Sequence, residues 1–414
     1  MTKPTVILGA GFAGLFTALH LCHKNYGLPV VLIDKAERFI FKPLLYELLS
    51  TEMTIDQVSP LYEELLFRCN VTYVQDQVTE IDLQQSEVKL ISGLSYSYDN
   101  LVLSLGSKAN YFKIDGAAEN ALTFRTSDDV NHLKQHLRSS LQCASQTVDD
   151  AKRQAMLTVA VIGAGPAGIE IALTLADLLP QWYKRLGGDT EEIKIVIINR
   201  SPEILKGDIN SHSRKTIKKA LDRRTNLEIR SQAEVQGVLT DGLEYLQDHQ
   251  LQQLNCATTV WTAGNTLNPL VAQLAVSEQF RDRRGRLKVE PTLQLPDYPE
   301  VFAAGDCACL DPNLPATAQV AYQQGKAIAH NLVALSKGQP LVPASIHLRG
   351  TLMKLGLGEA SANMFDRFTV AGQLGHLIRE GTYLELLPNS VHNFKATTQW
   401  LTDELFSHHL RVAK

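Results

Sequence analysis

The chain carries the same glycine pattern twice, each time directly after a run of strand-forming residues. TVIL at residues 5–8 leads into GAGFAG at 9–14, and TVAVI at 158–162 leads into GAGPAG at 163–168. Glycine suits a tight strand-to-helix turn because a side chain there would obstruct both the packing of the helix and the approach of a phosphate. We therefore expect two strand–turn–helix units, each with a phosphate-binding turn at its helix N-terminus.

The first unit continues with the acidic residue that such a fold uses to hold a ribose. The strand-like run at 29–33 ends in Asp34, twenty residues after Gly14. At this spacing a carboxylate accepts hydrogen bonds from the ribose hydroxyls of a dinucleotide. The first unit is therefore expected to bind a dinucleotide.

The second unit departs from this pattern. Its next strand, at 193–198, ends in Asn199 and Arg200, thirty-one residues after Gly168, with an insertion at 180–189. A carboxylate at the strand end would repel the 2′-phosphate of NADPH, whereas Asn199 does not, and the guanidinium of Arg200 can pair with that phosphate. The sequence thus favours NADPH over NADH. The alternative is that Arg200 is a solvated turn residue.

Two dinucleotide units in one chain of 414 residues predict FAD and NAD(P)H, between which electrons pass. Strand-like runs at 101–107 and 301–306 are expected to return to the first unit, which would make it discontinuous. The expected fold is α/β, with two Rossmann-like domains and a C-terminal membrane-associating segment. The domains are an FAD-binding domain at 1–120 and 285–342, an NAD(P)H-binding domain at 150–284, and a C-terminal domain with an amphipathic helix at 343–414.

The overall composition narrows the function. With 44% hydrophobic residues, 20% charged residues and a formal net charge of −4, the chain lacks the basic field that attracts nucleic acid. Its six cysteines form no CxxC pair and show no metal-ligand spacing with histidine. We therefore expect no metal site and no redox dithiol of the kind that disulfide reductases and sulfide:quinone oxidoreductases need. No export signal is expected, because the N-terminus leads directly into a strand-like run. No transmembrane helix is expected either, because Pro166, glycines and acids interrupt the apolar stretch at 159–179.

Four motifs resemble, in the same order, those of the two-dinucleotide-binding flavoprotein superfamily. They are GAGFAG with Asp34, GAGPAGIE from residue 163, WTAG at 261–264 and VFAAGDCA at 301–308. The resemblance implies that Asp306 holds the ribityl chain of the flavin. The candidate cofactor-binding residues of the first unit are Gly9, Gly11, Phe12, Ala13, Gly14, Asp34, Lys35, Pro43, Leu44, Gly106, Gly305, Asp306, Ala318 and Gln319. Those of the second unit are Gly163, Gly165, Gly168, Asn199, Arg200 and Gly264.

A shorter motif points to the electron acceptor. AQVAYQ at 318–323 resembles the AQxAxQ motif of the type II NAD(P)H:quinone oxidoreductases, the alternative NADH dehydrogenases, and FKPLLYE at 41–47 resembles a flavin-lining segment of that family. The resemblance implies that Gln319 and Gln323, one helical turn apart, line the quinone site. A neutral amide can donate to a quinone carbonyl and accept from the hydroxyl formed on reduction. The alternative is that both are ordinary polar residues near a helix start.

Glu170, just after the second glycine motif, matches a family glutamate proposed to lie near the flavin and the nicotinamide. The resemblance adds Glu170 to Gln319 and Gln323 as a candidate catalytic residue. The alternative is a structural role, because the helix dipole stabilises an acid in the first turn.

The C-terminal end has the pattern of an amphipathic helix. From residue 392 the sequence HNFKATTQWLTDELFSHHLRVAK places Phe394, Leu401 and Leu405 on one side, with basic residues near the terminus. Such a helix can lie in a membrane interface, where a long-tailed quinone is met. The alternative is that it packs on the protein itself.

The resemblance as a whole implies an FAD-dependent enzyme that transfers two electrons from NAD(P)H to a lipophilic quinone without pumping protons. Its general character resembles the cyanobacterial and plastid branch that reduces demethylphylloquinone. The enzyme would then bind peripherally to the cytoplasmic side of a thylakoid or plasma membrane. A respiratory-type enzyme that reduces menaquinone, ubiquinone or plastoquinone is one alternative, and a slow-turnover redox-sensing flavoprotein is the other. A homodimer is compatible with each of them.

Overall fold

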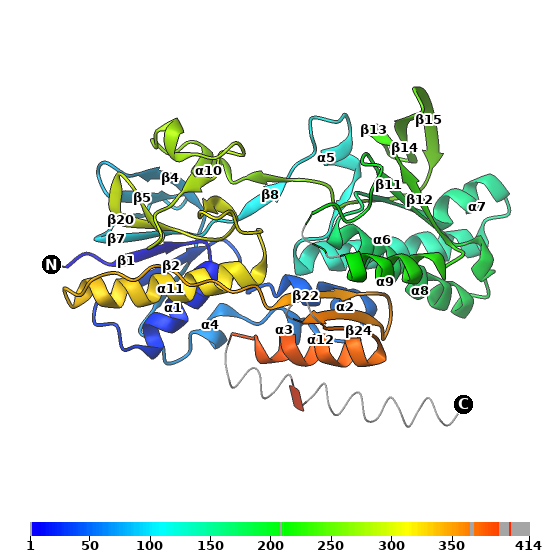
Figure 1. Ribbon diagram of the computed structural model, residues 1–414. Helices are drawn as coiled ribbons and strands as arrows, with labels where there is room; N and C mark the ends of the chain where they lie inside the picture. Colours follow the sequence, from blue (N-terminus) through cyan, green and yellow to red (C-terminus); the bar gives the residue numbers. More distant parts are fainter. Residues whose placement is uncertain (1, 208, 210, 365–367, 389–396, 399–414) are drawn as a thin grey trace.

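Two mainly parallel sheets organise the part of the chain that the structure describes (Figure 1). The computed structural model describes residues 2–207, 209, 211–364, 368–388 and 397–398. The first sheet has the order β19 (Gln294–Leu295), β20 (Tyr298–Ala303), β7 (Asn100–Leu103), β1 (Thr5–Leu8), β2 (Val30–Asp34) and β3 (Thr72–Gln75). The second has the order β12 (Leu227–Ser231), β11 (Lys194–Asn199), β10 (Thr158–Ile162), β16 (Thr258–Trp261) and β9 (Leu122–Thr123).

Smaller sheets and the helices surround these two sheets. The antiparallel sheets are β4 (Val78–Asp82), β5 (Glu87–Leu90) and β6 (Ser95–Ser97); β13 (Glu234–Leu239), β14 (Gly242–Gln247) and β15 (Gln250–Asn255); and β22 (Gly350–Lys354), β23 (Ala360–Met364) and β24 (Phe368–Gly372). Short pairings join β8 (Ser107–Ala109) to β17 (Asn265–Leu267) and β18 (Leu287–Lys288) to β21 (Ala308–Cys309). The longer helices are α1 (Phe12–His23), α6 (Ser127–Gln146), α7 (Asp150–Leu157), α8 (Pro166–Arg185), α9 (Ser211–Asp222), α11 (Ala318–Ser336) and α12 (Gln373–Glu385). The short ones are α2 (Leu45–Ser50), α3 (Ile55–Val58), α4 (Tyr62–Leu65), α5 (Ala117–Asn120), α10 (Pro269–Ala272), η1 (Lys42–Leu44), η2 (Thr190–Glu192), η3 (Glu278–Phe280) and η4 (Gly305–Cys307).

The first sheet is covered on both faces, which explains why β1 consists only of buried residues. Ile7 and Leu32 belong to the core that includes α1 and α11, whereas Val6 and Ile33 belong to the core beneath the β4–β6 sheet. The two helices approach each other closely at Gly325, where a Cβ atom would lie 2.4 Å from the Ala13 carbonyl oxygen. A residue without a side chain is therefore needed at this crossing.

The chain returns to the first sheet after it has built the second. β20 pairs in parallel with β7, with Val301 opposite Leu101, although the two strands lie about two hundred residues apart in the sequence. β7 lies between β20 and β1, so the residues that follow these three strands meet at one edge of the sheet.

The C-terminal part forms a small layer against the rest of the molecule. Strands β22–β24 carry α12, and in Figure 1 this layer lies beside α2, with β22 also contacting α8. The amphipathic helix expected around residues 394–406 lies outside the described residues. Within the described ranges, no helix is both long and apolar enough to cross a membrane.

A buried ionic cluster joins the C-terminal layer to the first unit. We define it as Glu47 of α2, Glu52 just after α2, Lys354 of β22 and Arg379 of α12. Lys354 Nζ lies 3.0 Å from Glu47 Oε1 and also contacts Glu52, while Arg379 Nη1 lies 2.5 Å from Glu47 Oε1. The side chains of Glu47, Lys354 and Arg379 are fully buried. Burial alone would raise the pKa of Glu47, but Arg379 and Lys354 lower it to about 2, so Glu47 is ionised.

We expect Glu47→Gln to destabilise the folded protein by roughly 3–5 kcal/mol, because two cations would stay buried with one carboxylate fewer. In the wild type this contribution is complete above the ordinary glutamate value of 4.5 and is lost as the pH falls toward 2, since the folded-state pKa is the lower one. Denaturant unfolding measures the difference. Glu359→Gln is the control, because Glu359 meets Arg223 at the surface, where the two side chains are 30% and 61% exposed. If the Glu47→Gln variant were as stable as the wild type, Glu47 would not be the stabilising anion of the ionic cluster.

Candidate functional site

The first glycine turn contains two kinds of glycine. Gly14 is required by the fold, because its Cβ would lie 1.9 Å from the Gly9 carbonyl oxygen, and Gly9 itself has a φ of +88°. Gly11 is different, since a Cβ there would meet nothing within 4 Å of the protein. Open space at Gly11 on the N-terminal side of α1 fits the close approach of a pyrophosphate.

Asp34 lies where it can hold a ribose. Its Oδ2 accepts a hydrogen bond from the backbone N–H of Ala10 at 2.7 Å, and its Oδ1 accepts one from Ala36 at 2.9 Å. A carboxylate has about four acceptor positions, so acceptor capacity remains for the ribose hydroxyls. The turn and Asp34 together fit the adenosine half of FAD.

The second turn repeats the first in detail. Gly163 N–H donates to the Ile198 carbonyl at 2.9 Å, as Gly9 N–H donates to Ile33 at 2.8 Å. A Cβ on Gly168 would lie 1.9 Å from the Gly163 carbonyl oxygen, whereas one on Gly165 would meet nothing within 4 Å. The residues therefore fit a second dinucleotide, the nicotinamide.

Asn199 occupies the position that Asp34 has in the first unit. Its Oδ1 accepts a hydrogen bond from the backbone N–H of Ala164 at 3.4 Å, which is the counterpart of the Ala10–Asp34 contact. The spacing from Gly168 to Asn199 is longer than that from Gly14 to Asp34, because α8 continues to Arg185 and η2 follows before β11 begins. The insertion thus lies before the strand and leaves its carboxyl end unchanged.

Arg200 follows directly and points away from the core. Its side chain is 76% exposed, and its Nη1 lies 3.7 Å from Glu234 Oε1, whose side chain is 52% exposed. This is a loose surface contact that a phosphate can replace.

Asp306 lies at the edge where β7 and β20 end. Its Oδ2 accepts a hydrogen bond from Ser107 Oγ at 2.5 Å, and the adjacent Gly305 N–H donates to Gln324 Oε1 of α11 at 2.7 Å. Lys42 is also near: burial and Arg125 lower its pKa, while Asp306 acts in the opposite direction. The η1 segment, the Gly-Asp turn and the start of α11 therefore converge here.

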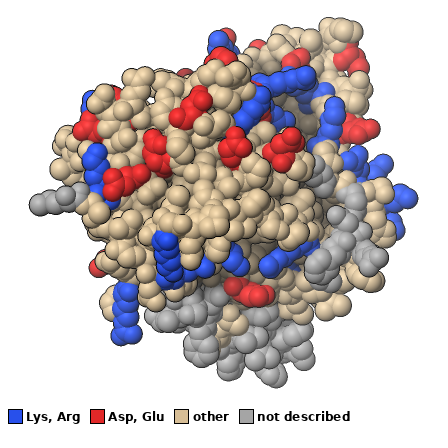
Figure 2. All heavy atoms as spheres, turned by 60° about the vertical axis from the view of Figure 1, so that its left-hand side comes forward, with Lys and Arg blue, Asp and Glu red and all other residues tan. Residues whose placement is uncertain are grey.

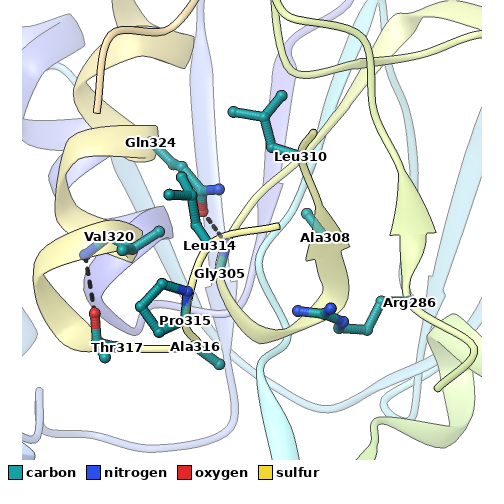
Figure 3. Close-up of a pocket in the computed structure, with 10 residues that line it drawn as sticks. All are labelled: Arg286, Gly305, Ala308, Leu310, Leu314, Pro315, Ala316, Thr317, Val320 and Gln324. Atoms are coloured by element: carbon teal, nitrogen blue, oxygen red, sulfur yellow. Dashed lines mark hydrogen bonds between the residues drawn. The ribbon is translucent and has the colours of Figure 1, made fainter. Parts of the chain in front are cut away.

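A small pocket lies beside this turn (Figure 3). It has a volume of about 10 Å³, roughly the room for one water molecule, and is lined by Arg286, Gly305, Thr317, Val320 and Gln324, among others. Figure 3 shows the Thr317 side chain accepting the Val320 N–H, which caps the start of α11. The pocket is far smaller than the ~300–1,000 Å³ typical of ligand sites, so we regard it as a side pocket and not as a ligand site.

The other candidate cofactor residues lie in turns or helix starts next to these strands. Phe12 and Ala13 begin α1, Lys35 follows β2, Pro43 and Leu44 lie in η1, Gly106 lies between β7 and β8, Gly264 lies between β16 and β17, and Ala318 begins α11.

Gln319 and Gln323 both bond the backbone of the segment at 347–350. Gln323 Oε1 accepts from His347 N–H at 2.9 Å, and its Nε2 donates to the carbonyls of His347 and Gln319 at 3.0 and 3.1 Å. Gln319 Oε1 accepts from Arg349 N–H at 3.1 Å, and its Nε2 donates to the Gly350 carbonyl at 3.2 Å. Gln319 and Gln323 lie one helical turn apart on α11, and both amides therefore contact the start of the C-terminal layer. Only Gln319 keeps a side-chain N–H that these bonds do not use.

Glu170 lies between the second turn and the ionic cluster. Its Oε1 accepts a hydrogen bond from the backbone N–H of Lys354 at 2.7 Å. Burial raises its pKa to about 7, although Arg379, the Lys354 N–H and Tyr46 lower it in part. A carboxyl that titrates near neutral pH can hold or release a proton there.

Arg379 lies beside the candidate site, and the sequence did not reveal it. Its Nη2 donates to the Pro43 carbonyl at 2.5 Å while its Nη1 contacts Glu47. It therefore holds the η1 segment from a helix more than three hundred residues away. No motif surrounds it, so only the fold brings it here.

The comparisons with known proteins agree with this geometry. The model of the pyridine nucleotide-disulphide oxidoreductase family matches residues 3–325. The alternative NAD(P)H-ubiquinone oxidoreductase C1 of Arabidopsis thaliana is 31% identical and is aligned over 96% of this chain and 80% of its own length. The demethylphylloquinone reductase NdbB of Synechocystis sp. is 30% identical over 96% of both chains. The structure of NDH2 from Plasmodium falciparum in complex with NADH matches with a TM-score of 0.85, at 19% identity and over 98% of both chains. The chain therefore belongs to the pyridine nucleotide-disulphide oxidoreductase family and, within it, to the type II NAD(P)H:quinone oxidoreductases.

Proposed function

We propose that this chain is an FAD-dependent oxidoreductase that transfers two electrons from NAD(P)H to a lipophilic quinone without pumping protons. The observation that carries the proposal is the pair of matching dinucleotide turns in one chain, together with the amide-bearing start of α11 beside Asp306. Bound FAD supplies the two-electron step that separates oxidation of the nicotinamide from reduction of the quinone. FAD is assigned to residues 1–120 and 285–342, NAD(P)H to 150–284, and membrane contact to 343–414.

The thiols near Asp306 support an acceptor other than a disulfide. Burial raises the pKa of Cys307 to about 12, and its Sγ donates to the Leu103 carbonyl, so the thiol is held in its protonated form. Cys309 lies against Arg286 and Asn313 instead. The protonated Cys307 and the separately bonded Cys309 therefore do not support a dithiol relay beside the flavin.

The quinone itself is a membrane molecule, and α12 has a suitable outer face. Leu374 and Leu377 are 60% and 40% exposed, and Phe368 at the start of β24 is 65% exposed. These side chains support peripheral contact with a membrane at the C-terminal layer.

The surface charges do not favour nucleic-acid binding. Figure 2 shows Lys and Arg interspersed with Asp and Glu on the face that it draws, so a nucleic acid would find no surface of a single charge sign there.

Steady-state turnover with a short-chain quinone tests the function. Because relatives are named for ubiquinone and for demethylphylloquinone, the assay compares a benzoquinone with a naphthoquinone. NAD(P)H should bleach the flavin, and one of the quinones should restore its colour much faster than oxygen does. A flavin that NAD(P)H bleaches and that no quinone reoxidises faster than oxygen would favour the redox-sensing alternative.

We expect Gln319→Leu to slow reoxidation of the flavin by quinone about two- to tenfold, the equivalent of one neutral hydrogen bond of roughly 0.5–1.5 kcal/mol. Gln319 has the unused N–H that can donate to a quinone carbonyl, so Gln323→Leu should slow this step less and chiefly loosen the segment at 347–350. Stopped-flow measurement of both half-reactions separates the two effects. Equal slowing of flavin reduction by NAD(P)H would place Gln319 outside the quinone site.

We also expect NADPH to be preferred over NADH about tenfold in kcat/KM, and Arg200→Ala to remove most of this preference. The figure corresponds to the low end of a charge-assisted contact, about 1.5 kcal/mol, because solvent screens an exposed arginine. Turnover with NADH should remain, since the 2′-phosphate is absent from it. Arg185→Ala, at the exposed end of α8, is the charge-matched control. A wild type that uses NADH as well as NADPH would refute the assignment of Arg200.

A further inference from the structure

A second pair of ionisable side chains adjoins the ionic cluster on α12. His376 and Glu380 are one helical turn apart and are 7% and 1% exposed. His376 Nε2 lies 3.2 Å from Glu380 Oε1. Among the described residues, His376 Nδ1 and Glu380 Oε2 have no hydrogen-bond partner. Buried polar atoms are normally bonded, so this pair is incompletely satisfied in the state that the structure describes.

The surrounding charges leave Glu380 without a cation. The groups that face the pair are Glu47 and Glu52 from α2 and the turn after it, Lys354 from β22, and Arg379 from α12 itself. Lys354 and Arg379 already balance the charges of Glu47 and Glu52, so no further cation is left for Glu380 among these groups. Burial, Glu47 and Glu52 raise the pKa of Glu380 to about 8, against the opposing effect of Lys354 and Arg379. Burial and Lys354 lower the pKa of His376, so at neutral pH the pair shares one proton.

The three fully buried members of the cluster, Glu47, Lys354 and Arg379, cannot exchange that proton near neutral pH. The pKa values of Lys354 and Arg379 are raised by Glu47, despite burial, so both keep their protons. The pKa of Glu47 is lowered to about 2, so Glu47 stays ionised. Glu52 is 29% exposed and contacts Lys354, and it therefore forms the solvent side of the cluster.

Quinone reduction needs one proton from solvent. The balanced reaction is NAD(P)H + H⁺ + quinone → NAD(P)⁺ + quinol, in which the hydride carries two electrons and one hydrogen nucleus. The second quinol proton must come through the protein or from its surface. Strand β22 connects the two places, since Gly350 at its start bonds Gln319 and Lys354 at its end lies in the cluster. The separation along the strand is roughly 13 Å at the rise of an extended chain.

We propose that the His376–Glu380 pair is a proton store for quinone reduction: it gives one proton toward the quinone oxygen and regains one from solvent on the Glu52 side. The proposal rests on the proposed function and deepens it. In the loaded state the Glu380 carboxyl O–H donates to His376 Nε2. In the unloaded state the Glu380 carboxylate accepts from a His376 Nε2–H, so the pair stays hydrogen-bonded in both.

Infrared spectroscopy of the flavin-loaded protein tests the store itself, independently of turnover. Besides the band of the Glu170 carboxyl, whose pKa is about 7, the wild type should show a protonated-carboxyl C=O band that disappears as the pH rises through about 8. Glu380→Gln should remove this band, whereas Glu385→Gln, on the exposed side of the same helix, should keep it. A wild-type spectrum without such a band between pH 6 and 9 would overturn the proposal even if Glu380→Gln failed to fold.

Stopped-flow kinetics tests the role in the reaction. Glu380→Gln and His376→Gln should slow reoxidation by quinone on the order of a hundredfold at pH 7 and remove its decline above pH 8, while flavin reduction by NAD(P)H stays unchanged. Variants that keep the wild-type rate and pH profile would overturn the proton store and leave the quinone-reductase function intact. If no quinone reoxidised the flavin of the wild-type enzyme, the proposed quinone-reductase function would be wrong, and the proton store would be wrong with it.

Discussion

The burial of Glu47 between Arg379 and Lys354 is the contact on which the arrangement of the site depends. A carboxylate without its partners would cost several kcal/mol in this position, so the three residues must arrive together. They come from α2, β22 and α12, and Arg379 also bonds the Pro43 carbonyl. The C-terminal layer is therefore fixed to the η1 and α2 segments by charge as well as by apolar packing. Residues that follow both dinucleotide units in the sequence are thereby placed against the first unit.

Local sequence patterns were sufficient for the two glycine turns. Tight turns depend on residues close in sequence, so GAGFAG and GAGPAG predicted strand, turn and helix at both places. Family membership followed from motif order and is confirmed by the match over residues 3–325. The strand end at Asn199 was harder to align, because the extra residues lengthen α8. The equivalent contacts of Ala10 with Asp34 and of Ala164 with Asn199 give the alignment directly.

Contacts between distant segments were not predictable in this way. Nothing near Gln319 and Gln323 in the sequence indicates that their amides would bond the backbone at 347–350, twenty-four or more residues away. The structure also separates two residues that the motif treats alike. Gln323 uses both of its N–H groups in these bonds, whereas Gln319 uses one, so their capacities toward a ligand differ. A motif gives residue types at a spacing, and hydrogen-bond accounting decides which of them remains free to act.

The helix α12 shows how one element serves two environments. Buried positions recur at His376, Arg379 and Glu380, at the three- and four-residue spacing of a single helical face. Leu374 and Leu377 are exposed on the other side. The inner face of the helix holds Arg379 against Glu47 and against the Pro43 carbonyl. One helix thus joins an exposed apolar side of the C-terminal layer to the η1 and α2 segments of the first unit.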